Sequence, residues 1–151
     1  MSVARRTSTF PGPTSPATVL VMPKDNVSWR IVTAFITWST SAVVANRRLN
    51  LSITDGAGNS IAVFAGGNVP ASSGANSTFA SQVLQSGVNA GGFEQITIPD
   101  DVWIQPQWNV SFAIDTQQAG DAITFANVQI EQYVRTKEVA PAPRAGQDTP
   151  P

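Results

Sequence analysis

Apolar and polar residues alternate over most of the chain, and this period of two is typical of β-strands with one buried face. The clearest stretches run from Arg47 to Thr54 and from Trp108 to Asp115. In both, the apolar residues occupy every second position and the residues between them are polar or small. Asp55–Asn59, with two glycines and two turn-capping side chains, follows the first stretch and predicts a hairpin into Ser60 to Ala65.

Two longer stretches break this simple alternation. Ser28 to Thr40 carries large apolar residues on both faces. It is therefore expected to be a central strand covered on both sides, or a strand that changes sheets halfway. Ala122 to Arg135 changes its apolar parity within its length, so we predict a β-bulge near Ala126 and Asn127.

Three more stretches complete the expected strands: Ala17 to Met22, Ser77 to Leu84 and Phe93 to Ile98. No helical period competes with them, because the long runs without Gly or Pro are rich in residues that prefer strands. About eight strands with regularly spaced turn signals predict an all-β fold. We expect a single antiparallel β-sandwich, for which an eight-stranded jelly roll is the best fit.

Both ends of the chain are rich in proline, including Pro11, Pro13 and Pro16 near the N-terminus. Because proline cannot donate to a strand ladder and favours an extended polyproline path, we expect arms there and no sheet. The expected organisation is an extended arm over residues 1–16, a sandwich domain over 17–135 and a Pro-rich tail over 136–151. The arms are expected to dock onto neighbouring subunits.

The chain carries unusually little charge. Charged residues make up 13% of its 151 residues, and the net charge is −1. A surface of this kind protects poorly against association, which favours a protein packed against copies of itself or a partner. A secreted module with a neutral polar exterior is the alternative.

The same composition argues against two classes of partner. No concentrated basic patch is present, so we do not expect nucleic-acid binding. No apolar stretch approaches the roughly 20 residues needed to cross a bilayer, so we expect no membrane partner. The segment after Arg5 and Arg6 is polar and proline-rich where a signal peptide would be apolar, so synthesis in the cytoplasm is expected.

The residue types that carry most enzymatic chemistry are missing. The chain has no histidine and no cysteine, which removes the commonest general base, the commonest metal ligand and any thiolate nucleophile. Asp100 and Asp101 are the only adjacent acids, and after Pro99 they are typical of a helix N-terminus or a turn. The loop Asp55–Asn59 lacks the alternating acidic ligands of a calcium site. We expect no catalytic activity, no metal and no cofactor.

The four tryptophans fall into two groups. Trp29 and Trp108 open strands in phase with core positions, so we expect them to be buried. Trp38 and Trp103 are less constrained, and they fit either a subunit interface, where Trp is enriched at energetic hot spots, or a sugar-stacking platform. We favour the interface. The further candidates for partner contact lie in the two arms or at the end of the last strand: Val3, Arg5, Arg6, Phe10, Arg135, Lys137 and Arg144.

A pattern in this sequence resembles small structural proteins of tailed-bacteriophage virions. It consists of a Trp29–Arg30 opening, a Ser- and Thr-rich turn, Asn46–Arg47 and the Asp55–Asn59 hairpin, with Gly120–Asp121 before the last strand. Ala45 departs from it, because the pattern has glycine there. The resemblance implies a β-sandwich with a structural role and no catalytic signature.

Such proteins are often capsid decoration proteins, so the resemblance implies a location on the capsid surface of a virion. We expect a homo-oligomer, preferably a trimer, that clamps neighbouring subunits of the major capsid protein through its arms. One alternative is a phage tail or fibre component that binds a host glycan, and another is a carbohydrate-binding module detached from an enzyme. Asn46 and Arg47 are expected to bond loop carbonyls and fix a corner of the sandwich, or to contact a partner.

Overall fold

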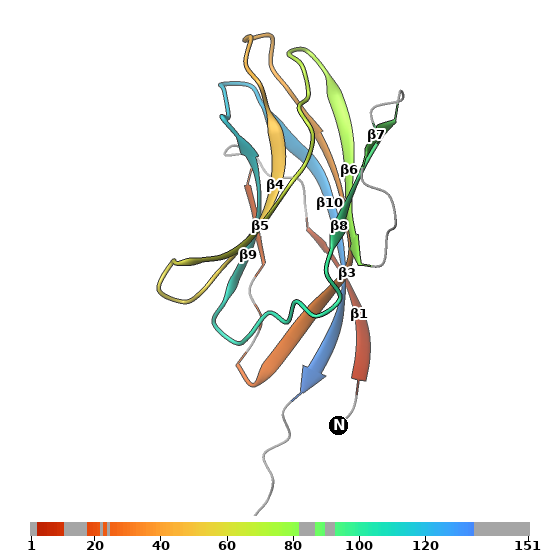
Figure 1. Ribbon diagram of the computed structural model, residues 1–151, viewed down its shortest axis with the longest axis vertical. Coiled ribbons are helices and arrows are strands. Elements are labelled where there is room, and N and C mark those ends of the chain that lie inside the picture. The colour runs from red at the N-terminus through yellow and green to blue at the C-terminus, as the bar shows by residue number, and fades with distance from the viewer. Residues whose placement is uncertain are drawn as a thin grey trace, which may run out of the picture.

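The computed structural model describes residues 3–10, 18–21, 23, 25–81, 87–89 and 93–134. These residues form strands and turns and no helix, and their strands lie in two sheets that pack against each other (Figure 1). The all-β prediction with two packed sheets is confirmed. The strands are β1 (Val3–Phe10), β2 (Thr18–Val21), β3 (Val27–Ser39), β4 (Arg48–Thr54), β5 (Ser60–Ala65), β6 (Gly74–Ser81), β7 (Gly87–Asn89), β8 (Phe93–Ile98), β9 (Asn109–Asp115) and β10 (Ala122–Val134).

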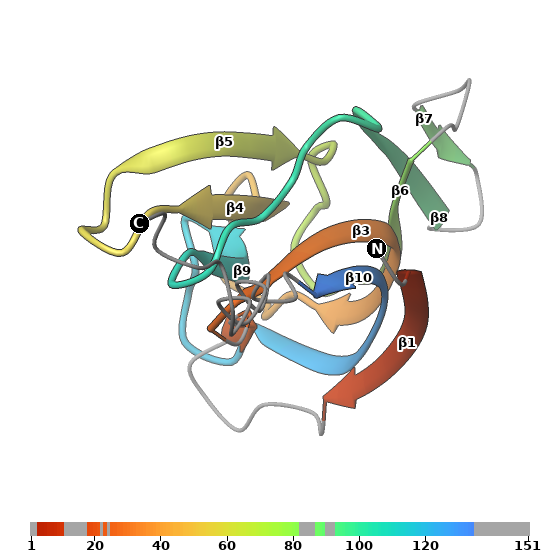
Figure 2. The same ribbon diagram turned by 90° about the horizontal axis from the view of Figure 1, so that it is seen from below.

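The strand order is β1-β10-β3-β6-β8-β7 in the six-stranded sheet and β2-β9-β4-β5 in the four-stranded sheet. Figure 2 shows the two layers from below, with β4, β5 and β9 on one side and β1, β3, β6, β8 and β10 on the other. Among the ten described strands, all pairings are antiparallel except that of β6 with β8, which is parallel. The expectation of a purely antiparallel sandwich is therefore wrong at this one pair.

Each of the eight stretches expected to be strands contains a strand, although residues 17, 22, 82–84 and 135 of these stretches lie outside the described residues. Two further strands occur among the described residues, so the expected number of about eight is too low. One of these, β1, lies inside the expected N-terminal arm and pairs with β10 from Val3 to Phe10. The prediction that residues 1–16 form no sheet is wrong, because the prolines all follow the strand and do not interrupt its ladder. The other, β7, is three residues long and pairs with β8.

Strand β3 stays in one sheet, because it pairs with β10 along its whole length. Its register skips Val32, so Ile31 and Ala34 both face the core although their sequence parity differs. On β10 the skipped residue is Thr124. The bulge predicted in β10 exists, but it lies at Thr124 and so precedes the predicted position near Ala126 and Asn127.

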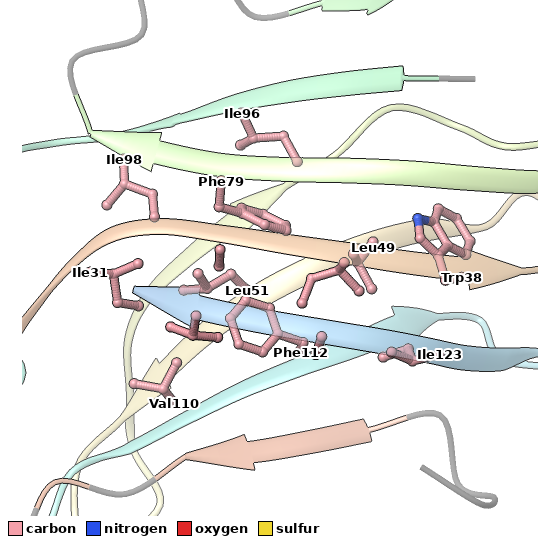
Figure 3. Close-up of a cluster of buried hydrophobic side chains, with 14 of the residues drawn as sticks. Ile31, Trp38, Leu49, Leu51, Phe79, Ile96, Ile98, Val110, Phe112 and Ile123 are labelled. Atoms are coloured by element: carbon pink, nitrogen blue, oxygen red, sulfur yellow. The ribbon is translucent and has the colours of Figure 1, made fainter. Parts of the chain in front are cut away.

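The core fills the space between the two sheets with large apolar side chains (Figure 3). Phe79 of β6 and Phe112 of β9 meet across this space, with ring centroids 5.8 Å apart. Both rings are fully buried. They join the six-stranded sheet to the four-stranded sheet near the centre of the sandwich.

Candidate functional site

Three loops meet at one end of the sandwich, at the top of Figure 1: residues 40–47, 66–73 and 116–121. Backbone hydrogen bonds join the first two, from Ser72 N to Ser41 O at 2.9 Å and from Val69 N to Arg47 O at 2.8 Å. The Thr40 hydroxyl donates to the carbonyl of Pro70 at 2.7 Å. These loops therefore form one connected corner.

A buried ion pair joins the first loop to the third. Arg47 Nε donates to Asp121 Oδ2 at 2.7 Å, and both side chains are fully buried. The same guanidinium donates to the carbonyl of Val43 at 2.6 Å, to that of Ala45 at 3.4 Å and to Ser41 Oγ at 3.0 Å. Arg47 thus organises the loop that precedes it, with a rigid fork of donors that lysine could not reproduce.

The carboxylate of Asp121 is held in its charged form. Burial raises its pKa, but hydrogen bonds from the backbone N–H groups of Ser41 and Gln118, at 2.6 and 2.8 Å, and from Arg47 outweigh that effect. The pKa of Asp121 therefore lies below its ordinary value. A carboxylate so fully engaged acts as a structural anchor for the corner.

Asn46 contributes to the corner through its backbone. Its carbonyl accepts a hydrogen bond from the hydroxyl of Thr116, and its own side chain is exposed. Of the two residues expected to fix the corner, only Arg47 does so with its side chain. Residues 117–122 line an open depression of about 410 Å³ beside the corner, in which Asp121 is the one titratable residue.

A second buried polar network runs along the core side of the six-stranded sheet, from β3 through β6 to β8. Trp38 Nε1 donates to Ser77 Oγ at 3.0 Å, and Ser77 Oγ donates to Glu94 Oε2 at 3.1 Å. The other carboxylate oxygen of Glu94 accepts from the N–H of Gly67. A Cβ at Gly66 would meet the carboxylate of Glu94, so any larger residue there would have to displace this carboxylate from its hydrogen bonds.

The position of Trp38 corrects the prediction that it lies at a subunit interface. Its side chain is 1% exposed, and its indole N–H is satisfied inside the sandwich. The bulge at Val32 is the reason, because it turns the second half of β3 so that Ile36 and Trp38 face the core. Trp29 and Trp108, expected in the core, are partly buried and pack against it.

Trp103 lies in the connection between β8 and β9 and remains partly exposed. Its ring packs edge-on against Tyr133 at 4.5 Å, and the guanidinium carbon of Arg30 lies 5.7 Å from its centroid. Arg30 is held in turn by an ion pair with Glu131 at 2.5 Å. Trp103 is thus a fixed surface aromatic residue, whose indole is supported by a cation and a second ring.

The other candidates for partner contact lie in the two terminal segments. Val3, Arg5, Arg6 and Phe10 belong to β1, whose backbone pairs with β10 from Val3 opposite Tyr133 to Phe10 opposite Ala126. They lie in a sheet strand and not in a separate arm. Arg135, Lys137 and Arg144 lie outside the described residues.

The outer face of the six-stranded sheet is uncharged over its central rows. The residues that alternate with core positions there are aromatic, hydroxyl or amide residues: Thr33, Phe35, Thr37, Asn76, Thr78, Phe93, Gln95, Thr97, Phe125, Asn127 and Gln129. We call this set the outer face.

Three phenylalanines stand out on the outer face. Phe93 is 52% exposed and Phe125 is 41% exposed, and the ring of Phe125 lies 6.2 Å from that of Phe35. In the row of residues between Phe125 and Phe93, Thr37 Oγ1 donates to Asn76 Oδ1 at 2.9 Å. A face of aromatic rings and neutral polar groups suits contact with another neutral surface, because no charge has to be desolvated.

No family model matches this chain, and no curated protein or solved structure shows a significant match to it. Within the described ranges, no group of three or more acidic side chains is arranged to hold a metal ion. The same part of the chain contains no helix long and apolar enough to span a membrane.

Proposed function

We propose that this chain is a non-enzymatic structural protein of a virion, most specifically a capsid decoration protein that binds the major capsid protein. The observation that best supports this is the outer face, which exposes Phe93 and Phe125 among neutral Thr, Asn and Gln side chains. Interface cores are depleted in charge and enriched in aromatic residues, as this face is. The buried ion pair of Arg47 with Asp121 and the buried network of Glu94, in contrast, hold the fold together.

We infer that the sandwich is an eight-stranded jelly roll with one insertion. Without β7 and β8 the strand orders reduce to β1-β10-β3-β6 and β2-β9-β4-β5. Successive strands then alternate between the sheets, except that β4 and β5 form a hairpin within one sheet, and this is the arrangement that two interlocked Greek keys require. On this reading β1 and β2 are the first two strands of the roll, and β7–β8 extends one sheet beyond β6.

The placement of β1 changes how the protein would bind a capsid. Because Val3–Phe10 completes the sheet of its own chain, these residues do not form a free clamp. We therefore assign the main contact to the outer face, with Trp103 near its margin. The homo-oligomer, preferably a trimer, remains part of the proposal, since several copies of one face add avidity without a new type of contact.

Co-sedimentation with capsids assembled without this chain tests the proposal. We expect the wild-type chain to bind saturably. We expect Phe93→Lys to raise the apparent Kd about tenfold or more, because it places an unpaired charge in the contact. Val44→Lys is the matched control, since Val44 is 92% exposed in a loop at the corner end of the sandwich.

Two results would count against the proposal. Wild-type protein that remains in the supernatant at every concentration would exclude the capsid as the partner. Equal binding by Phe93→Lys and Val44→Lys would exclude the outer face as the contact. Folding of each variant is checked by its thermal unfolding before binding is measured.

A host glycan is the second candidate partner, and the outer face is the observation that favours it. Aromatic rings next to amide and hydroxyl groups, as at Phe125, Thr37 and Asn76, suit the apolar faces and hydroxyls of a neutral sugar. The tail or fibre alternative would use this same face. Binding to a glycan array that is lost in Phe125→Ala, without binding to capsids, would favour it.

A further inference from the structure

The four sheet edges differ in how well they are protected against pairing with another chain. Two edge strands are short: β2 has four residues and β7 has three. A third, β1, contains Arg5 and Arg6. Short strands and charged residues are the usual means by which proteins prevent edge-to-edge association. β5 has neither, because it is six residues long and contains no charged residue.

β5 also exposes apolar side chains along this edge. Ile61 is 48% exposed and Val63 is 53% exposed, and both lie on the side of the sheet that faces away from the core. Among the described residues, β5 is hydrogen-bonded only to β4. Figure 2 shows β5 at the outer boundary of the molecule, with β4 on one side of it.

The register of β5 determines where its backbone groups point. Gly66 N donates to Leu49 O at 2.9 Å, and the same register continues through the pair of Phe64 with Leu51. Because the direction of backbone groups alternates along an antiparallel strand, the N–H and C=O of Val63 and Ala65 point away from β4. The only irregularity lies next to Ile61, where the pairing with β4 shifts.

We propose that β5 pairs antiparallel with β5 of a second copy of this chain, across a two-fold axis at Val63. Such an axis places Val63 opposite its own copy and Ile61 opposite Ala65. Of these positions, Val63 and Ala65 have backbone N–H and C=O groups directed away from β4. The occupant is a second copy because the edge is complementary to itself: each strand supplies matching donors and acceptors, and neither brings a charge.

The pairing would join the two four-stranded sheets into one continuous sheet. A six-residue edge is smaller than the roughly 800 Å² per partner of a standard interface, so we expect a reversible, concentration-dependent association. This contact is independent of the capsid proposal. It uses the edge of the other sheet, and it is measured without capsids.

Sedimentation velocity of the full chain over a concentration series tests the pairing. We expect the wild-type protein to shift toward twice the mass of its smallest species as concentration rises. Val63→Pro removes an N–H that β4 does not use, at an edge position where proline is tolerated, so it blocks the second copy and leaves the β4–β5 ladder intact. We expect this variant to remain at the smallest species.

Two further variants separate edge pairing from folding. Val63→Lys places two like charges opposite each other at the axis, and we expect it to raise the dissociation constant about tenfold or more. Val63→Thr keeps the β-branched shape and should associate like the wild type. A wild-type protein that does not change mass with concentration would overturn the pairing, as would Val63→Pro and Val63→Lys variants that associate as the wild type does.

Discussion

Replacing Arg47 with methionine is expected to lower the free energy of unfolding by about 3–5 kcal/mol. The substitution leaves the buried carboxylate of Asp121 without its cation, and it also removes the donors that bind the carbonyls of Val43 and Ala45. Leaving one partner of a buried pair uncompensated is far more costly than losing an exposed pair. Equilibrium unfolding in urea measures the loss.

Arg48 supplies the matched control for this prediction. Its ion pair with Asp115 has a similar length, 2.9 Å, but the two side chains are 46% and 38% exposed. Arg48→Met is expected to cost about 1 kcal/mol or less. The double variant Arg47→Met/Asp121→Leu should recover part of the loss, because it removes the unpaired charge. Equal costs for Arg47→Met and Arg48→Met would contradict the role given to the corner.

Phe112→Ala is expected to destabilise the fold by about 3–5 kcal/mol. Phe112 is fully buried, and its ring meets that of Phe79 across the two sheets at 5.8 Å. The substitution would leave a cavity at the point where the sheets pack most directly, and the surrounding strands are too constrained by their ladders to close it. Urea unfolding again provides the measurement.

Phe93 is the matched control for the core prediction. It is the same residue type on the outer face and is 52% exposed. Phe93→Ala should therefore cost about 1 kcal/mol or less. A loss at Phe93 as large as that at Phe112 would mean that the outer face is part of the folding core and is not available to a partner.

The strands could be predicted from the sequence because their apolar residues repeat with a period of two. Leu49, Leu51 and Ile53 of β4 all face the core as that period requires. β1 could not be predicted in this way, because the prolines that closely follow Phe10 favour an extended arm over the whole segment. β7 is too short to show any period.

The bulges explain the remaining errors within strands. A single skipped residue reverses every later side chain, so the burial of Trp38 depends on the bulge at Val32. Nothing in the local sequence marks that residue. In β10, by contrast, the change of parity revealed that a bulge must exist and only its position at Thr124 was missed.

The polar networks could be predicted only in part. Arg47 and Gly120–Asp121 belong to one pattern noted in the sequence, but the pairing of Arg47 with Asp121 joins residues 74 positions apart and depends on the fold. The burial of Glu94 could have been predicted from its position in the sequence. Glu94 shares its parity with Ile96 and Ile98, so a carboxylate was placed on a core face and needed buried donors.

The fold and the proposed function are connected through two surfaces that do not take part in the core, the outer face and the β5 edge. The ion pair of Arg47 with Asp121 and the network of Glu94 use buried polar groups to fix loops and strands. The outer face and the β5 edge are neutral and partly apolar, so they can bind other proteins with little desolvation of charge. The proposed role as a decoration protein would use both properties, the fixed fold and the neutral contact surfaces.

The most direct test is the temperature at which capsids assembled without this chain lose their integrity, measured as the chain is added. A protein that binds only the assembled lattice stabilises it by RT ln(1 + [L]/Kd), where [L] is the concentration of free chain. We expect the disruption temperature to rise with concentration, and to rise less for Phe93→Lys. A disruption temperature that stays constant at chain concentrations well above the Kd from co-sedimentation would contradict the proposed role. A chain that does not bind the capsids at all would contradict it as well.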